Sequence, residues 1–257
     1  MPRAYTRAVS PSLADCELTH LERMPIDPTK ADRQHSAYEQ ALEQAGYEII
    51  RLPDLPDHPD GAFVEDTALL LDGHAVILRP GAASRASETF STAEGLAGHF
   101  ELHRVADGHV DGGDVLRIGR TLYVGLSTRT DAAGIAALAE IVRPLSFEVV
   151  QAELKDCLHL KTGATLAGPD RTGSPVLLYN AASVDPAQFT GVEPMAVDSL
   201  EPAAANCLRV GDRLILPFGN PRTAQRVRDQ GFHVVEIDVS ELQKAEAGVT
   251  CMSLIAY

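Results

Sequence analysis

Short apolar runs separated by turn residues recur along the chain and predict pairs of β-strands. Two runs at residues 68–71 and 75–78 flank Asp72-Gly73-His74, the pattern of a β-hairpin. A second hairpin is predicted over residues 115–125, with its turn at Gly119-Arg120. These hairpins are the most regular feature of the sequence.

Longer segments with helical spacing of apolar positions separate the hairpins. Apolar side chains recur on one face of residues 30–45 and end at Gly46, which predicts a helix followed by a strand at 47–52. The same spacing rules predict strands at 4–9, 101–105 and 175–179, and helices at 84–99 and 131–142.

The pattern repeats. Residues 116–124 align with residues 208–216 at an offset of 208 − 116 = 92, and an Arg-Thr pair precedes the next helix in both units. The unit around Asp66 is a looser third copy, and Leu158 opens a degraded fourth. The N-terminal strand, the 30–45 helix and the C-terminal tail supply a fifth. Units of roughly 40–50 residues with internal strands predict a radial array, an α/β propeller of ββαβ modules with pseudo-fivefold symmetry, forming one domain over 1–257.

Composition narrows the class of protein. The chain has 257 residues, 45% hydrophobic and 23% charged, which is ordinary for a soluble globular protein. Its net charge of 22 − 36 = −14 argues against nucleic-acid or anionic-membrane partners. An N-terminal apolar signal and a run of about 18 apolar residues are both missing, so we expect a cytoplasmic protein. The four dispersed cysteines predict reduced thiols and no zinc site.

In a radial array each unit brings the start of its first strand to one central channel. The residues expected to meet there are Glu65, Asp66, Asp111, Asp114, His159, Asn206 and Cys251. A cysteine, a histidine and carboxylates in one place are what nucleophilic catalysis requires. The alternatives are that Cys251 and His159 are core residues among apolar neighbours, and that the acids cap turns.

The surplus of acids indicates the charge of the ligand. Asp60, Glu65, Asp66 and Asp111 together suit a planar cation with several N–H donors, such as a guanidinium. Arg85 and Arg129, at repeated helix entries, would hold a carboxylate at the other end of the ligand, or else form packing and surface ion pairs. The combination predicts an arginine derivative. Acids beside Cys251 also predict a protonated thiol that ionises when the cation arrives.

Six motifs carry a family resemblance that runs essentially from end to end. They are FVED (63–66), DGGD (111–114), GLSTRT (125–130), LHLKTG (158–163), AANC (204–207) and TCMS (250–253). Together they resemble the dimethylarginine dimethylaminohydrolases of the guanidine-modifying superfamily. The resemblance implies a five-bladed α/β propeller that hydrolyses N-methylated arginines to citrulline plus methylamine or dimethylamine, without a cofactor.

The resemblance also implies residue roles. Cys251 is the nucleophile that forms a thiouronium intermediate, His159 the acid/base residue, and Asp111 the acid that orients it. The residues implied in substrate binding are Asp60, Glu65 and Asp66 at the nitrogens, Arg85 and Arg129 at the carboxylate, Leu13 in a lid, and Ala245 near the nucleophile.

Several alternatives remain open at this level. An arginine deiminase would share the propeller, but chains of that family are longer and carry an inserted helical domain. Another amidine hydrolase of the superfamily would have the same core. A non-catalytic binder of arginine derivatives is expected to lack Cys251 or His159, and both are present. The sequence leaves open whether two copies form a homodimer.

Overall fold

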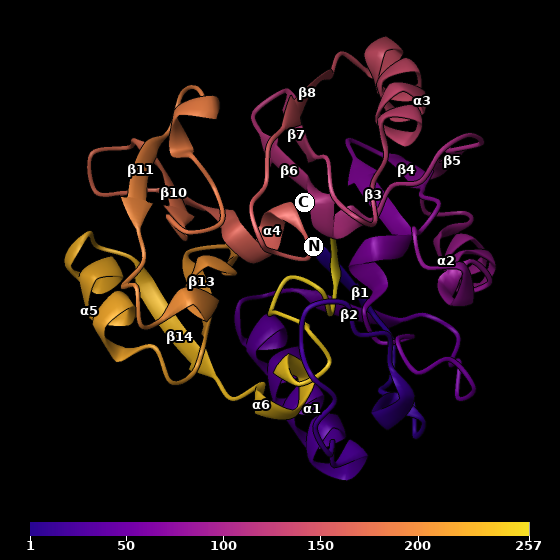
Figure 1. Ribbon diagram of the computed structural model, residues 1–257, viewed down its shortest axis with the longest axis horizontal. Helices are drawn as coiled ribbons and strands as arrows, with labels where there is room; N and C mark the ends of the chain where they lie inside the picture. The colour runs from indigo at the N-terminus through magenta and orange to yellow at the C-terminus, as the bar shows by residue number, and fades with distance from the viewer. Residues whose placement is uncertain (257) are drawn as a thin grey trace.

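Five three-stranded sheets are arranged around a common axis in the computed structural model, which describes residues 1–256 (Figure 1). Each sheet is a blade whose first two strands are antiparallel and whose third strand runs parallel to the second. The predicted α/β propeller of five blades is confirmed. No helix within residues 1–256 is long and apolar enough to cross a membrane.

Three blades follow the full ββαβ pattern. In one, the hairpin β6 (Val115–Ile118) and β7 (Thr121–Gly125) leads through α3 (Ala132–Val142) to β8 (Glu148–Ala152). The turn is possible because Gly119 has φ +61°, and Asp131 caps the helix by accepting from the Gly134 amide at 2.8 Å. The other two are β3 (Ala68–Leu71), β4 (His74–Ile77), α2 (Glu88–Leu96), β5 (Glu101–Arg104), and β12 (Leu208–Val210), β13 (Arg213–Pro217), α5 (Pro221–Asp229), β14 (His233–Ile237).

Two blades depart from that pattern. The degraded unit contains β9 (Ala164–Pro169), β10 (Pro175–Tyr179) and β11 (Glu193–Ala196), with a 3₁₀ turn at Pro186–Gln188 where the others have a helix. The last blade is assembled from both ends of the chain: β15 (Leu254–Ala256) pairs antiparallel with β1 (Arg3–Thr6), which α1 (Pro28–Gln44) connects to β2 (Glu48–Arg51). The predicted contribution of the C-terminal tail is therefore confirmed.

Some predicted boundaries were wrong. The helix expected over 84–99 is confined to α2, because residues 83–85 form a separate 3₁₀ turn (Ala83–Arg85). Helix α1 begins at Pro28, two residues earlier than expected, because the Asp27 side chain accepts from the Thr29 and Lys30 amides. Strand β1 ends at Thr6 rather than residue 9, because its partner β2 ends at Arg51, and beyond it the Arg7 side chain donates to the Pro53 carbonyl at 3.0 Å.

The first strand of each blade faces the axis. Residues of β3, β6, β9, β12 and β15 line an axial cavity of about 560 Å³. The segments that precede these strands meet at one end of it: the 3₁₀ turns Val64–Thr67, Gly112–Asp114 and Pro202–Ala205, the helix α4 (Leu160–Gly163), and the turn around Cys251 that follows α6 (Ser240–Gln243). This is the convergence expected from the repeat.

Candidate functional site

A small cavity of about 20 Å³ lies among these converging segments. It encloses seven of the ten residues that the sequence predicts for the site: Asp60, Asp66, Arg85, Arg129, His159, Ala245 and Cys251. Its other lining residues are Glu17, Phe63, Leu158, Glu246 and Ala247. Residues from both ends and the middle of the chain therefore line one site.

His159 is held by Asp111. Its Nε2 lies 3.0 Å from Asp111 Oδ2, and the other carboxylate oxygen accepts a hydrogen bond from the Gly81 amide at 2.8 Å. Burial alone would lower the pKa of His159. The charges of Asp66, Asp111 and Asp114, with the hydrogen bond to Asp111, outweigh it and raise the pKa to about 9. The imidazole is therefore protonated at neutral pH and can donate a proton.

Two glycines explain how the backbone brings these groups together. A Cβ on Gly112 would collide with the Glu65 carbonyl oxygen, and one on Gly113 would lie 2.5 Å from His159 Nδ1. Asp66 Oδ1 accepts from the Gly113 amide at 2.9 Å, and Asp114 Oδ1 accepts from the Leu160 amide at 2.9 Å. The Asp-Gly-Gly-Asp motif thus lets a buried acid and the histidine ring pack against bare backbone.

Cys251 sits in a tight turn and is partly exposed. Its Sγ accepts a hydrogen bond from the Gly248 amide at 3.3 Å, and the turn is anchored by the Thr250 amide, which donates to Asn206 Oδ1 at 3.1 Å. Burial, followed by the negative charges of Glu65 and Asp66, raises the pKa of the Cys251 thiol to about 12. The resting sulfur is a thiol, as the acid-rich surroundings predict.

The acids Asp66 and Asp60 of the cavity differ in pKa. Burial raises the pKa of Asp66, but the charges of His159 and Arg85 outweigh it and lower the pKa to about 2. Arg85 Nη1 lies 2.6 Å from Asp66 Oδ2, and its Nη2 lies 2.9 Å from Glu88 Oε2. The Asp60 carboxylate accepts from the Glu17 amide at 3.0 Å, and burial raises its pKa to about 6.

Metal binding at the centre of this site is poorly supported. Asp66, Asp111 and His159 place one ligand atom each within 4.8 Å of one another. However, Asp66 already accepts from Arg85 and Gly113, and Asp111 from Gly81, while its other oxygen is bonded to the His159 ring. The arrangement is that of an acid-supported proton donor beside a thiol, which can add a sulfur to an electrophilic carbon and protonate the departing group.

A segment near the N-terminus covers the cavity, and the sequence did not predict how it is held. Glu246, which has φ +59°, accepts from the amides of Thr19, His20 and Leu21 at 2.9, 2.5 and 2.6 Å. Arg129 Nη2 donates to Thr19 Oγ1 at 2.8 Å. No local sequence pattern relates Glu246 to amides more than 200 positions away, so these hydrogen bonds could not be predicted from the sequence.

Three predicted residues, all in the described part of the chain, lie outside the lining of the small cavity. Leu13 is fully buried in the hydrophobic core. Glu65 pairs with Lys161 Nζ at 2.5 Å, accepts from Thr250 Oγ1 at 2.7 Å and lines the axial cavity. Asp111 contacts His159 Nε2 but does not line the cavity, as expected of an acid that orients the imidazole. The roles of Leu13 and Glu65 in binding remain predictions.

Comparison with known proteins places this site in a family context. The chain is 37% identical to an N(G),N(G)-dimethylarginine dimethylaminohydrolase of Streptomyces coelicolor, over 98% of this chain and 96% of that protein. It is 36% identical to the Pseudomonas aeruginosa protein of the same name, over 89% of each. A solved structure of a Pseudomonas aeruginosa DDAH mutant with citrulline has a TM-score of 0.90 and 33% identity, covering 99% of both chains.

More distant structures share the fold alone. The N-terminal domain of ArgZ, a cyanobacterial arginine dihydrolase, has a TM-score of 0.81 at 20% identity, over 99% of this chain and 98% of that domain. No family model matches the sequence.

Proposed function

This chain belongs to the N(G),N(G)-dimethylarginine dimethylaminohydrolase family, and on that premise we propose that it hydrolyses N-methylated arginines to citrulline plus dimethylamine or methylamine. The observation that carries the proposal is the small cavity itself. There, a partly exposed Cys251 lies with His159, which Asp111 holds, and with the acids Asp60 and Asp66.

The proposed reaction begins when the guanidinium enters between the acids. Its positive charge offsets the negative charges that hold the proton on Cys251, so the thiol releases that proton to solvent and the thiolate forms in the complex. The thiolate attacks the guanidinium carbon and forms a C–S bond. His159 donates its proton to the methylated nitrogen, and the C–N bond to the amine breaks, which leaves a thiouronium on the sulfur.

Hydrolysis of that intermediate regenerates the enzyme. The amine leaves, and neutral His159 takes a proton from a water molecule as the water oxygen adds to the same carbon. The C–S bond then breaks, citrulline is released, and the sulfur recovers its proton. Asp111 keeps the His159 ring in one orientation through both steps, because its carboxylate is itself fixed by Gly81.

Binding at the far end of the substrate rests on the two arginines. Arg129 lines the cavity and bonds the covering segment, so it can exchange Thr19 for the substrate carboxylate when that segment moves. Arg85 is buried and already paired with Asp66 and Glu88. In our proposal Arg85 mainly fixes the charge and position of Asp66. It also lines the cavity, where it can contribute to binding the substrate carboxylate.

The test is to incubate the protein separately with asymmetric dimethylarginine, monomethylarginine and arginine and to measure citrulline. We expect turnover of the methylated arginines. Faster turnover of arginine would favour a deiminase, and binding without citrulline from any of them would favour the non-catalytic alternative. The homodimer and the cytoplasmic location stay predictions, which light scattering and cell fractionation can test.

The identity of the nucleophile is tested with two cysteine variants. Cys251→Ser should abolish citrulline formation and leave the thermal unfolding midpoint close to that of the parent. Cys207→Ser is the matched control, because its Sγ is buried and lies 3.0 Å from Thr165 Oγ1, away from the small cavity. It should retain turnover. Loss of activity in both variants would show that Cys251 was wrongly chosen.

A further inference from the structure

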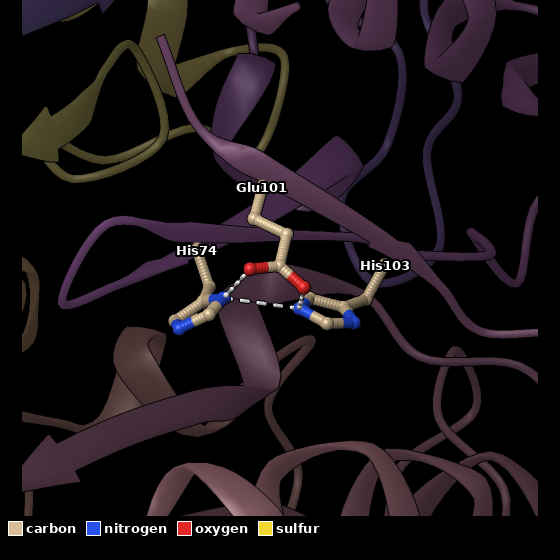
Figure 2. Close-up of side chains that lie close together, drawn as sticks. All are labelled: His74, Glu101 and His103. Carbon is tan, nitrogen blue, oxygen red and sulfur yellow. Dashed lines mark hydrogen bonds and ion pairs between the residues drawn. The ribbon is translucent and has the colours of Figure 1, made fainter.

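Two histidines and a glutamate meet on one face of the blade formed by β3, β4 and β5 (Figure 2). His74 begins β4, and its partner in the parallel ladder is Glu101 at the start of β5. His103 lies two residues after Glu101, so the period of the strand returns its side chain to the same face. The three side chains thus converge by sheet register.

The spacing of their ligand atoms fits a tetrahedral ion. His74 Nδ1 lies 3.1 Å from His103 Nε2. Glu101 Oε2 lies 3.5 Å from His74 Nδ1, and Glu101 Oε1 lies 3.9 Å from His103 Nε2. Ligand atoms at roughly 2.0–2.2 Å from a tetrahedral zinc ion lie roughly 3.3–3.6 Å apart. Small rotations of the glutamate would bring one oxygen to that distance from both nitrogens.

The donor chemistry points in the same direction. Two imidazole nitrogens and one carboxylate oxygen are a ligand set that suits zinc and neighbouring divalent transition metals rather than magnesium or calcium. Figure 2 shows both rings directing a nitrogen toward the same carboxylate. The histidine side chains are 26% exposed and that of Glu101 is 69% exposed, so solvent can reach a fourth coordination position.

We propose that His74, Glu101 and His103 form a binding site for one divalent transition-metal ion of the zinc class. The sequence predicted no zinc site because its cysteines are dispersed, but these ligands come from two strands that only the sheet brings together. A bound ion would link β4 to β5, the two strands that α2 connects in the chain. It would stabilise this blade, because only the folded chain brings the three ligands together. The site shares no residue with the small cavity.

The proposal is tested by titrating zinc chloride into metal-free protein that carries Cys251→Ser, which removes the catalytic thiol as a competing ligand. Calorimetry should show one ion per chain. Cobalt(II) should give the intense visible bands of a tetrahedral site. His74→Ala and His103→Ala should each weaken binding at least about tenfold, because even losing a residue that only supports a ligand costs about 10- to 100-fold.

The matched control is His233→Ala. His233 also lies on the third strand of a blade and faces a single carboxylate, with Nδ1 3.9 Å from Asp212 Oδ2. Its loss should leave zinc affinity unchanged, and zinc should raise the melting temperature of the control but not of His103→Ala. The proposal is overturned if the protein binds no zinc, or if the His74 and His103 variants bind it as tightly as the control. Far-UV circular dichroism establishes that each variant is folded.

Discussion

At the scale of single residues, the site holds two protons that its chemistry must move. The pKa of His159 is raised to about 9 and that of the Cys251 thiol to about 12, so both groups are protonated in the free protein at neutral pH. Burial and Glu65 are the larger causes at Cys251, but the buried negative charge of Asp66 contributes to both shifts, and it raises the pKa of His159 against the effect of burial. That charge stabilises an imidazolium and destabilises a thiolate. A cationic substrate is therefore needed to release the nucleophile.

We expect the free protein to show no thiolate ultraviolet absorbance attributable to Cys251 near neutral pH. A saturating amidinium analogue of arginine should bring that absorbance into the neutral range, because its charge offsets those of Glu65 and Asp66. L-Citrulline is the matched control, since it has the same backbone and no positive charge at the reacting end. Cys251→Ser provides the baseline. A Cys251 thiolate at neutral pH without ligand would contradict this account.

The pH dependence of kcat/KM should have two limbs, a steep rise through about pH 6 and a shallower rise that levels off near pH 9. Asp60, whose pKa burial raises to about 6, must be ionised to bind a guanidinium, so activity falls as pH decreases through that value. Forming the Cys251 thiolate releases one proton, so kcat/KM keeps rising with pH until His159 loses its own proton near 9, where kcat/KM levels off. Steady-state rates measured across this range test both limbs.

Asp60→Asn separates the two limbs. It should remove the acidic limb, keep the alkaline one, and lower kcat/KM about 10- to 100-fold, the value of one charged hydrogen bond of about 1.5–3 kcal/mol. An unchanged acidic limb would assign that titration to another group. The titration of His159 also affects the free energy of unfolding. Its stabilising contribution is complete below the ordinary pKa of 6.5 and is lost as pH rises through about 9.

At the scale of the elements, the turn that contains Gly112 and Gly113 positions the acid/base residue. Gly113→Ala should lower kcat on the order of 100-fold, because the added Cβ would lie 2.5 Å from His159 Nδ1 and displace the ring. Gly119→Ala is the control. It has open space around it but φ +61°, so it should cost about 1 kcal/mol in unfolding free energy and leave kcat unchanged.

The two readouts must separate: kcat should fall in Gly113→Ala and stay unchanged in Gly119→Ala, although Gly119→Ala lowers the unfolding free energy. Equal losses of kcat in the Gly113 and Gly119 variants would mean that the first acts through general destabilisation. Chemical denaturation and steady-state kinetics on the same preparations distinguish the cases.

What the sequence predicts at this scale depends on how local the signal is. Hairpin turns such as Asp72-Gly73 are encoded within a few residues, and the repeat placed Asp111, His159 and Cys251 at equivalent positions. The hydrogen bonds between the Glu246 carboxylate and the amides of residues 19–21 were not predictable, because they join two irregular segments without periodicity. The meeting of His74 with His103 depends on the register of parallel strands, which a single sequence does not reveal.

At the scale of the whole molecule, function depends on closing the ring. Each blade supplies one segment to the site, and the last blade exists only because β15 pairs with β1 at Tyr5–Leu254 and Arg3–Ala256. Leu254 and Tyr5 pack in the same apolar cluster, so burial as well as hydrogen bonding joins the two ends. Cys251 lies three residues before that paired strand, which ties the position of the nucleophile to ring closure.

A circular permutant provides the test of this dependence. A short Gly/Ser linker joins the two ends of the chain, and new ends are opened between Thr172 and Gly173, in the exposed turn connecting β9 and β10. Because the β1–β15 pairing is kept and the opened turn lies away from the small cavity, we expect the parental circular dichroism spectrum and turnover. A second permutant opened between His20 and Leu21 should also fold, but with lower kcat/KM, because it cuts the segment that Glu246 holds over the cavity. If the first permutant folds without activity, the site depends on strain or order in the β9–β10 turn rather than on ring closure.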